Sequence, residues 1–260
     1  MIRILFFSCV VILLNACGAD QVKSQVNLSS PASVRSVERE FSKCVKDVCV
    51  TIELSFPAYE EQSGLDNFLN AEIQGFVKNA LSWGDRKADE YADYEEAAED
   101  FIAVFEKAET DGFNGMDWFF TLEGSEAFRS SDLISLRFST YHFTGGAHPN
   151  GFQTLLTYDL KGEGAKVEDN SLVLDEKRLL EIALAKFRAY HEVADGVSLE
   201  DDGRFFLDEG RFFLPQTMGY GDGVFLLIYN AYEIGPYVIG VTELEIPIEE
   251  LGGVVRQPLF

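Results

Sequence analysis

The chain is short of positive charge. Its 260 residues include 21 lysines and arginines against 44 aspartates and glutamates, which gives a formal net charge of −23. So acidic a surface repels the nucleic-acid backbone and anionic lipids, so we expect no nucleic-acid partner and no direct binding to an anionic membrane. It would attract a basic protein and speed the encounter with it. Solubility, or life in a salty medium, would explain the acidity without any partner.

The sequence also lacks the motifs of several enzyme classes. It has no Gly-x-Ser-x-Gly elbow, no phosphate-binding loop and no dinucleotide fingerprint. Its three histidines show no zinc-binding spacing such as His-Glu-x-x-His. We therefore predict no catalytic residue, no metal ligand and no cofactor, and we favour a non-catalytic role. Carboxylates are so numerous that a pair suited to glycoside cleavage stays open as an alternative.

Long apolar runs are scarce, and the main one lies at the start of the chain. Arg3 precedes an apolar run from Ile4 to Leu14, which is short for a membrane span and fits a signal peptide. The run ends in Leu14-Asn15-Ala16-Cys17, which resembles the lipobox of bacterial lipoproteins and implies a lipid on Cys17. Gly18 follows the cysteine, which implies an outer-membrane anchor facing the periplasm. An ordinary secretory peptide cut nearby is the alternative.

The rest of the chain divides by composition. Residues 1–16 are predicted to be the lipoprotein signal peptide. Residues 17–35 are polar and serine-rich, and we predict a flexible tether. We expect an N-terminal α/β subregion at 36–135 and a C-terminal subregion at 136–260. The membrane would be reached only through the lipid.

Two of the four cysteines are placed to form a disulfide. Cys44 and Cys49 flank Val45-Lys46-Asp47-Val48 in a chain that we expect to be exported, where disulfides persist. If Lys46-Asp47 form a two-residue turn, Val45 faces Val48 and Cys44 faces Cys49. We predict a bond between these cysteines. Two thiols with no histidine nearby are too few ligands for zinc.

The stretch 140–160 is predicted to be a β-hairpin around which the fold is organised. Apolar and polar residues alternate with a period of two on both sides of a loop that holds two of the three histidines. Gly145-Gly146 and Pro149-Asn150-Gly151 supply the conformational freedom and the turns that the connection needs.

The remaining pattern favours an α+β fold with a largely antiparallel sheet, helices packed on one face, and two subregions. Periodicity predicts a helix over 64–81 and two further helices capped by Asp93 and Asp175. Further strands are predicted at 48–56 (ended by Pro57), 117–123, 212–215, 224–229 and 238–246.

Two motifs carry a resemblance to a known family. Residues 141–148 read Tyr-His-Phe-Thr-Gly-Gly-Ala-His, and residues 225–240 contain Tyr-Asn-Ala-Tyr-Glu-Ile-Gly-Pro-Tyr. They resemble the extracytoplasmic domain shared by the anti-sigma factor RsiV and the non-catalytic part of the peptidoglycan deacetylase PdaC. Ala231 stands where that family has proline, and Gly235 where it has alanine. The resemblance covers most of residues 45–251, and it implies an envelope-exposed α+β domain of two subregions.

The resemblance also implies a function. RsiV binds and senses lysozyme, so we expect a non-catalytic binding module of the cell envelope whose partner is a basic protein such as lysozyme, or cell-wall glycan. The candidate binding residues lie in the two motifs: His142, Gly145, Gly146, His148, Tyr232, Glu233 and Tyr237.

Alternatives stay open for these residues and for the function. His142 could merely order the loop, and Glu233 could cap a turn or pair with an arginine. His142, His148 and Asp159 could instead serve a cell-wall hydrolase or a metal-dependent enzyme. A structural envelope protein is the third possibility.

Overall fold

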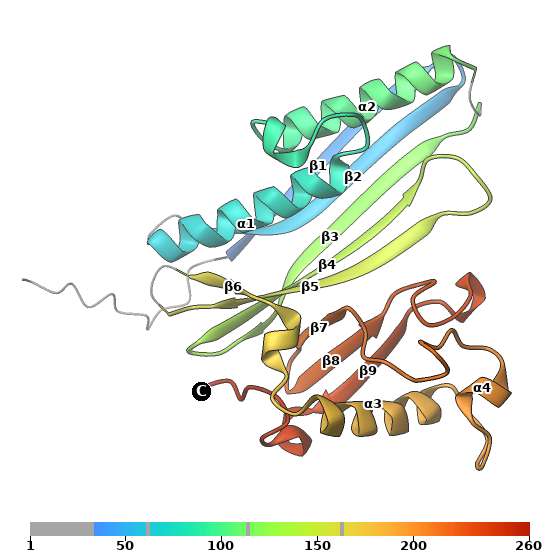
Figure 1. The fold of residues 1–260 in the computed structure, drawn as a ribbon. Helices are drawn as coiled ribbons and strands as arrows, with labels where there is room; N and C mark the ends of the chain where they lie inside the picture. Colours follow the sequence, from blue (N-terminus) through green and yellow to red (C-terminus); the bar gives the residue numbers. More distant parts are fainter. Residues whose placement is uncertain (1–33, 61–62, 113–114, 162–163) are drawn as a thin grey trace, which may run out of the picture. The chain divides into compact units, whose positions relative to one another are not determined.

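The computed structural model describes residues 34–60, 63–112, 115–161 and 164–260 (Figure 1). The predicted signal peptide, the lipidation site Cys17 and the predicted tether up to residue 33 lie outside these residues. The last two residues assigned to the tether, Val34 and Arg35, begin the first strand.

A six-stranded sheet, with its strands in the order of the chain, forms the larger part of the fold. Every neighbouring pair is antiparallel except β2 and β3, which are parallel because two helices connect them. The strands are β1 (Val34–Val45), β2 (Val48–Tyr59), β3 (Trp118–Arg129), β4 (Leu133–Phe143), β5 (Asn150–Asp159) and β6 (Ala165–Val167).

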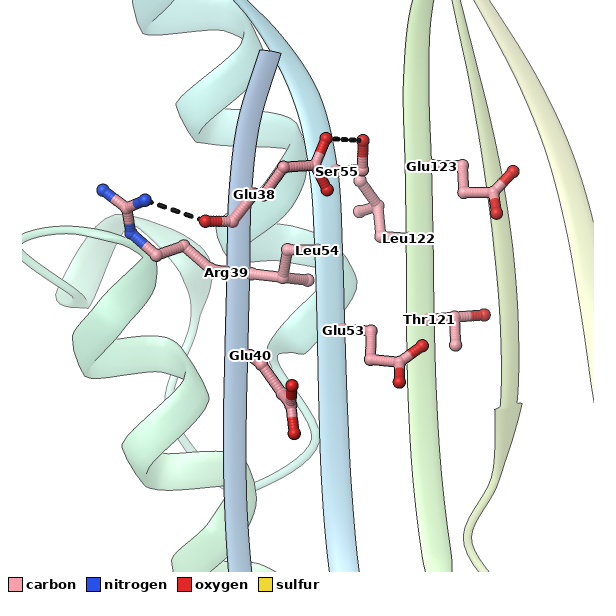
Figure 2. A pocket seen from close by; sticks show the side chains of 9 residues that line it. All are labelled: Glu38, Arg39, Glu40, Glu53, Leu54, Ser55, Thr121, Leu122 and Glu123. Carbon is pink, nitrogen blue, oxygen red and sulfur yellow. Dashed lines mark hydrogen bonds between the residues drawn. The ribbon is translucent and has the colours of Figure 1, made fainter.

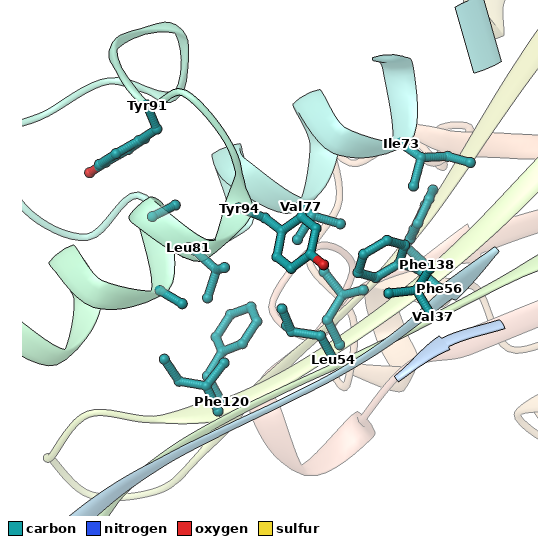
Figure 3. Packing of buried hydrophobic residues seen from close by; sticks show 14 of the residues in the cluster. Val37, Leu54, Phe56, Ile73, Val77, Leu81, Tyr91, Tyr94, Phe120 and Phe138 are labelled. Atoms are coloured by element: carbon teal, nitrogen blue, oxygen red, sulfur yellow. The ribbon is translucent and has the colours of Figure 1, made fainter. Parts of the chain in front are cut away.

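Two helices, α1 (Gly64–Leu81) and α2 (Tyr94–Thr110), cover one face of this sheet (Figure 1). Their starts follow from the sequence: Ser63 and Asp93 accept hydrogen bonds from backbone N–H groups of the first turn. Their apolar stripes pack on the inward side chains of the strands, and Figure 3 shows part of this core. The predicted helix over 64–81 and the Asp93 cap are confirmed. A short 3-10 turn, η1 (Ala88–Glu90), lies between the helices.

A three-stranded antiparallel sheet forms the second subregion, which confirms the predicted α+β class with two subregions. Its strands are β7 (Thr217–Tyr220), β8 (Val224–Tyr229) and β9 (Thr242–Pro247). They pack with α3 (Glu176–Tyr190), which Asp175 caps as predicted. The shorter elements are η2 (Asp169–Leu172), α4 (Leu199–Asp202), η3 (Tyr237–Ile239) and η4 (Ile248–Leu251).

Three predicted strand limits were wrong. Residues 212–215 pack on the second core as irregular chain, where the carbonyl of Phe213 accepts a hydrogen bond from Tyr229, and the strand begins only at Thr217. The strand predicted from residue 238 begins at Thr242, because η3 and Gly240, at φ 71°, come first. β2 runs past Pro57, since its pairing with β3 ends at Ser55 and a missing N–H is tolerated there.

The structure confirms both predicted hairpins, β1–β2 and β4–β5. Cys44 lies opposite Cys49 and Val45 opposite Val48, and a disulfide joins the two cysteines with an S–S distance of 2.01 Å. β4 and β5 form the central hairpin, with His142 opposite Asn150.

The division between the subregions lies later than residue 135, which falls inside β4. By sheet membership the first subregion extends to Val167. Arg137 of β4 and Glu243 of β9 join the two sheets through a two-pronged ion pair of 2.8 and 2.6 Å. In the parts of the chain that the structure describes, no helix is both long and apolar enough to cross a membrane.

Candidate functional site

The loop between β4 and β5 brings three of the predicted binding residues together. Gly145 and Gly146 take φ values of 97° and 106°, which side-chain-bearing residues rarely adopt, and so the chain turns back sharply. His148 then stacks on Tyr237, with ring centroids 3.8 Å apart. Its Nε2 lies 3.0 Å from the Tyr232 hydroxyl. His148, Tyr232 and Tyr237 therefore form one aromatic cluster, although His148 precedes Tyr232 by 84 positions in the sequence. We call it the tyrosine–histidine cluster.

Glu233 stabilises the turn that carries Tyr232. Its carboxylate accepts hydrogen bonds from the backbone N–H groups of Gln216 and Asn230, at 2.7 and 2.8 Å. Both oxygens are thus engaged in fixing the turn that follows β8. We assign Glu233 a positioning role for its neighbour Tyr232.

Tyr232 is held in a strained conformation. Its φ is 70°, which is unusual for a bulky residue, and its side chain is 52% exposed. Strain of this kind costs about 1–3 kcal/mol and clusters at binding sites. An exposed ring that is fixed at this cost suggests a surface kept ready for a ligand.

Asn230 fixes the cluster to the hairpin. Its side chain accepts a hydrogen bond from the N–H of Gln153 at 2.7 Å and donates one to the carbonyl of the same residue at 3.0 Å. The Asn230 side chain therefore makes the two backbone hydrogen bonds that a strand paired with β5 would make at Gln153. These bonds hold the turn after β8 beside the hairpin tip.

His142 lies apart from this cluster. It points to the helix-covered face, where Trp83 meets its ring edge-on at 4.7 Å. It is 8% exposed, and burial lowers its pKa. Its Nδ1 has no hydrogen-bond partner among the described residues. We interpret His142 as a neutral core residue at the base of the loop.

The alternative grouping of His142, His148 and Asp159 does not form. His142 pairs with Asn150 at one end of the hairpin, while Asp159 pairs with Leu133 at the other. Nine residues of strand put these ends ~30 Å apart. Asp159 instead accepts a hydrogen bond from Arg256 at 2.8 Å. These three groups cannot share a metal ion or a proton transfer.

Sequence reasoning missed an acidic surface on the helix-free face of the first sheet. Four exposed carboxylates from three neighbouring strands border a hollow of about 460 Å³ (Figure 2): Glu38, Glu40, Glu53 and Glu123. We call this surface the acidic face. In the sequence, this surface is indicated only by the glutamates at alternate positions of the first strand, Glu38 and Glu40.

The acidic face is poorly neutralised. Among the bonds that the described residues form, those to Glu38 are the ones on this face: hydrogen bonds from Ser36 and Ser55 lower the pKa of its carboxyl group. Of the described residues that line the hollow, Arg39 is the one cation. Its side chain points away from the hollow in Figure 2, and its guanidinium lies 3.9 Å from Glu95 of α2.

The other three carboxylates, those of Glu40, Glu53 and Glu123, form no hydrogen bond or ion pair with any residue that the structure describes. Glu40 and Glu53 are direct cross-strand partners. Like charges in that arrangement are destabilising.

Comparison with known proteins finds two families in series along the chain. The family described as deacetylase PdaC matches residues 43–151, and the protein family of unknown function DUF3298 matches residues 171–249. The search of curated proteins gave no match.

Two crystal structures show the same fold. A DUF3298 family protein from Pseudomonas aeruginosa PAO1 is 20% identical with a TM-score of 0.61, over 90% of this chain and 98% of that chain. A DUF3298 family member from Bacteroides fragilis is 18% identical with a TM-score of 0.61, over 87% of this chain and 94% of that one.

These findings agree with the motifs at the hairpin loop and after β8. The first match covers the hairpin loop, and the second covers the turn with Tyr232 and Tyr237. These two matches in series, together with the shared fold, fit the PdaC and RsiV type of extracytoplasmic domain, a cell-envelope domain in which a PdaC-type part is followed by a DUF3298 part.

Proposed function

We propose that this protein is a non-catalytic binding module of the cell envelope that holds a basic, cell-wall-active protein, such as a lysozyme-like enzyme, on its acidic face. The observation that carries the proposal is the Glu40–Glu53 pair, two like charges opposite each other that form no ion pair with a cation of the described residues. A sheet surface under no functional demand would gain stability from losing one of them.

Lysine and arginine side chains of a partner would supply the missing counter-charges. Ion pairs formed at such an interface set orientation and association rate more than they set affinity. The net charge of −23 adds a long-range attraction for any basic protein. The same surface would repel acidic proteins, and this gives the module a simple form of selectivity.

The tyrosine–histidine cluster offers a second contact on the same protein. Tyrosine is enriched among the residues that contribute most to binding energy, particularly where its ring is already rigid. Tyr232 and Tyr237 meet that condition, since His148 bonds to one and stacks on the other. We propose that the cluster provides the apolar contact of the interface and that the acidic face steers the partner to it.

We further propose that the module is a lipoprotein, anchored through Cys17 to the outer membrane and exposed to the periplasm. The support is the sequence Leu14-Asn15-Ala16-Cys17-Gly18. Several acyl chains on one cysteine would anchor it firmly, since each buried CH₂ contributes about 0.8 kcal/mol. Mass spectrometry of the membrane-extracted protein would show the lipid, and a Cys17→Ala variant would lose it.

The binding proposal is tested with hen lysozyme as the basic probe. We expect a complex at low ionic strength whose association slows steeply as salt is raised to about 0.5 M. Replacing Glu40, Glu53 and Glu123 by glutamine should slow association. A matched control changes Asp85, Asp89 and Glu99, three exposed acids that form no ion pair in the described structure, by the same total charge.

Each outcome decides the proposal. Slower association in the first variant only would support it. Equal slowing in both would mean that net charge alone attracts lysozyme, and the acidic face would lose its special role. The absence of any complex at low salt would remove the function, and a structural role in the envelope would then be favoured.

A further inference from the structure

A second hollow lies beside the tyrosine–histidine cluster, where the end of the β4–β5 hairpin meets the segment between β8 and β9. Its volume is about 420 Å³, which is within the usual range for small-molecule sites. In a chain of which 25% is charged, none of the described residues lining this cleft carries a charge. The main lining side chains are Ser139, Tyr141, Gln153, Ala231 and Tyr237.

Each of the two aromatic rings of the cleft packs against another ring, Tyr141 against Phe119 and Tyr237 against His148. Tyr141 lies opposite Gly151, and a Cβ at that glycine would come within 3.2 Å of the tyrosine ring. The glycine therefore lets the ring of Tyr141 lie close over the neighbouring strand. Tyr237 is fixed by stacking on His148 and by donating a hydrogen bond to the Pro149 carbonyl at 2.9 Å.

The polar groups of the cleft are also ordered. Arg137, held by Glu243, donates to Oε1 of Gln153 at 3.1 Å. The amide of Gln153 in turn donates to the hydroxyl of Ser139 at 2.8 Å. Because Ser139 accepts that bond, its own proton is free to be donated into the cleft. The charges of the ion pair thus set the orientation of neutral groups, while the charged groups themselves do not line the cleft.

We propose that this cleft binds a neutral sugar ring of a glycan. A sugar ring offers apolar C–H faces for tyrosine rings and hydroxyl or amide groups for serine and glutamine, which are the chemistries present here. A free amino acid or a phosphorylated ligand would need a charged group to meet its own charge, and the cleft supplies none. The sugar site adds to the proposed protein-binding function and does not depend on it.

The test uses a neutral tetramer of N-acetylglucosamine and the ¹⁵N-labelled protein. We expect saturable NMR shifts centred on the amides of Gly151 and Gly240, unchanged in about 0.5 M salt, whereas association with lysozyme should be much slower there. Tyr141→Ala should weaken the affinity about tenfold. Ala231→Phe should abolish it, because the larger side chain fills the cleft without removing a hydrogen bond.

Phe152→Ala is the matched control. Phe152 is 47% exposed against 45% for Tyr141, and it lies on the other face of the same hairpin. Unchanged affinity in this variant, with intact melting curves for all three, supports the proposal. No shift at about 10 mM sugar overturns it, as does equal binding by Ala231→Phe. Shifts at the same amides with a neutral pentapeptide, and none with the sugar, would assign the cleft to peptides instead.

Discussion

Replacing Glu53 by glutamine should make the free protein more stable and its complex with a basic partner slower to form. The side chain faces Glu40 across β1 and β2, and both are exposed and without an ion-pair partner among the described residues. Cross-strand pairs of this kind change stability by roughly 0.2–1 kcal/mol. For a domain of this size, that corresponds to a rise in melting temperature of ~1–3 °C. Asp85→Asn, which removes the same charge far from such a partner, should give a smaller change.

Thermal unfolding and stopped-flow association with lysozyme measure the two effects on the same preparations. The stability gain should disappear in about 0.5 M salt, because exposed charges are then screened from each other. Association at low salt should slow at least about threefold. A loss of stability in Glu53→Gln, or a gain that salt does not remove, would refute the repulsion. A gain in stability with unchanged association would mean that the partner does not use this face.

Three further predictions concern stability. Asp132 is 2% exposed; burial raises its pKa, but hydrogen bonds from the Leu259 amide, Arg256 and Ser130 outweigh burial and hold the pKa below its usual value. Asp132→Asn should therefore cost about 3 kcal/mol at neutral pH. The stability difference from the parent, measured by urea unfolding, should shrink as pH falls below ~4, because the contribution of a carboxyl group with a depressed pKa is complete above the unfolded pKa and is lost as pH falls through the folded pKa. Replacing Cys44 and Cys49 together by serine should cost about 2 kcal/mol, because the closed loop is short, and it should leave lysozyme association unchanged. Gly124→Ala should lower the free energy of unfolding by about 1–3 kcal/mol in the same assay, because the new Cβ would lie 2.7 Å from the Phe138 ring. An unchanged free energy of unfolding would show that the core rearranges to accommodate the methyl group.

The sequence predicted the elements that local chemistry determines. The helix over 64–81 and the caps at Asp93 and Asp175 follow from periodicity and from side chains that satisfy the first backbone N–H groups. The cysteine hairpin follows from a two-residue turn. In each case the deciding residues are within a few positions of one another.

What the sequence could not supply depends on contacts between distant segments. Periodicity does not show that the Asn230 side chain forms hydrogen bonds with the backbone of β5. Nor does it show that the Glu233 carboxylate accepts hydrogen bonds from two backbone N–H groups. The alternation of residues 38–40 and 53 places glutamates on one face of their strands, but only the register between β1 and β2 sets Glu40 against Glu53. His142 and His148 are close in sequence, yet their surroundings differ, because His142 lies on β4 beside Trp83 whereas His148 follows the turn at Gly145-Gly146 and meets Tyr232.

The acidic face and the neutral cleft adjoin across β3 and β4. Glu123 of the first is the cross-strand partner of Ser139 in the second, and Thr121 is the partner of Tyr141. Paired residues of neighbouring strands point to the same side of a sheet, so one ligand could reach both surfaces. A basic enzyme carrying its glycan presents both chemistries at once, and two weak contacts made by one body reinforce each other through a high effective concentration. This explains why the charged groups lie outside the cleft. The carboxylates attract the basic protein, and the neutral lining lets the sugar bind without removing water from a charged group.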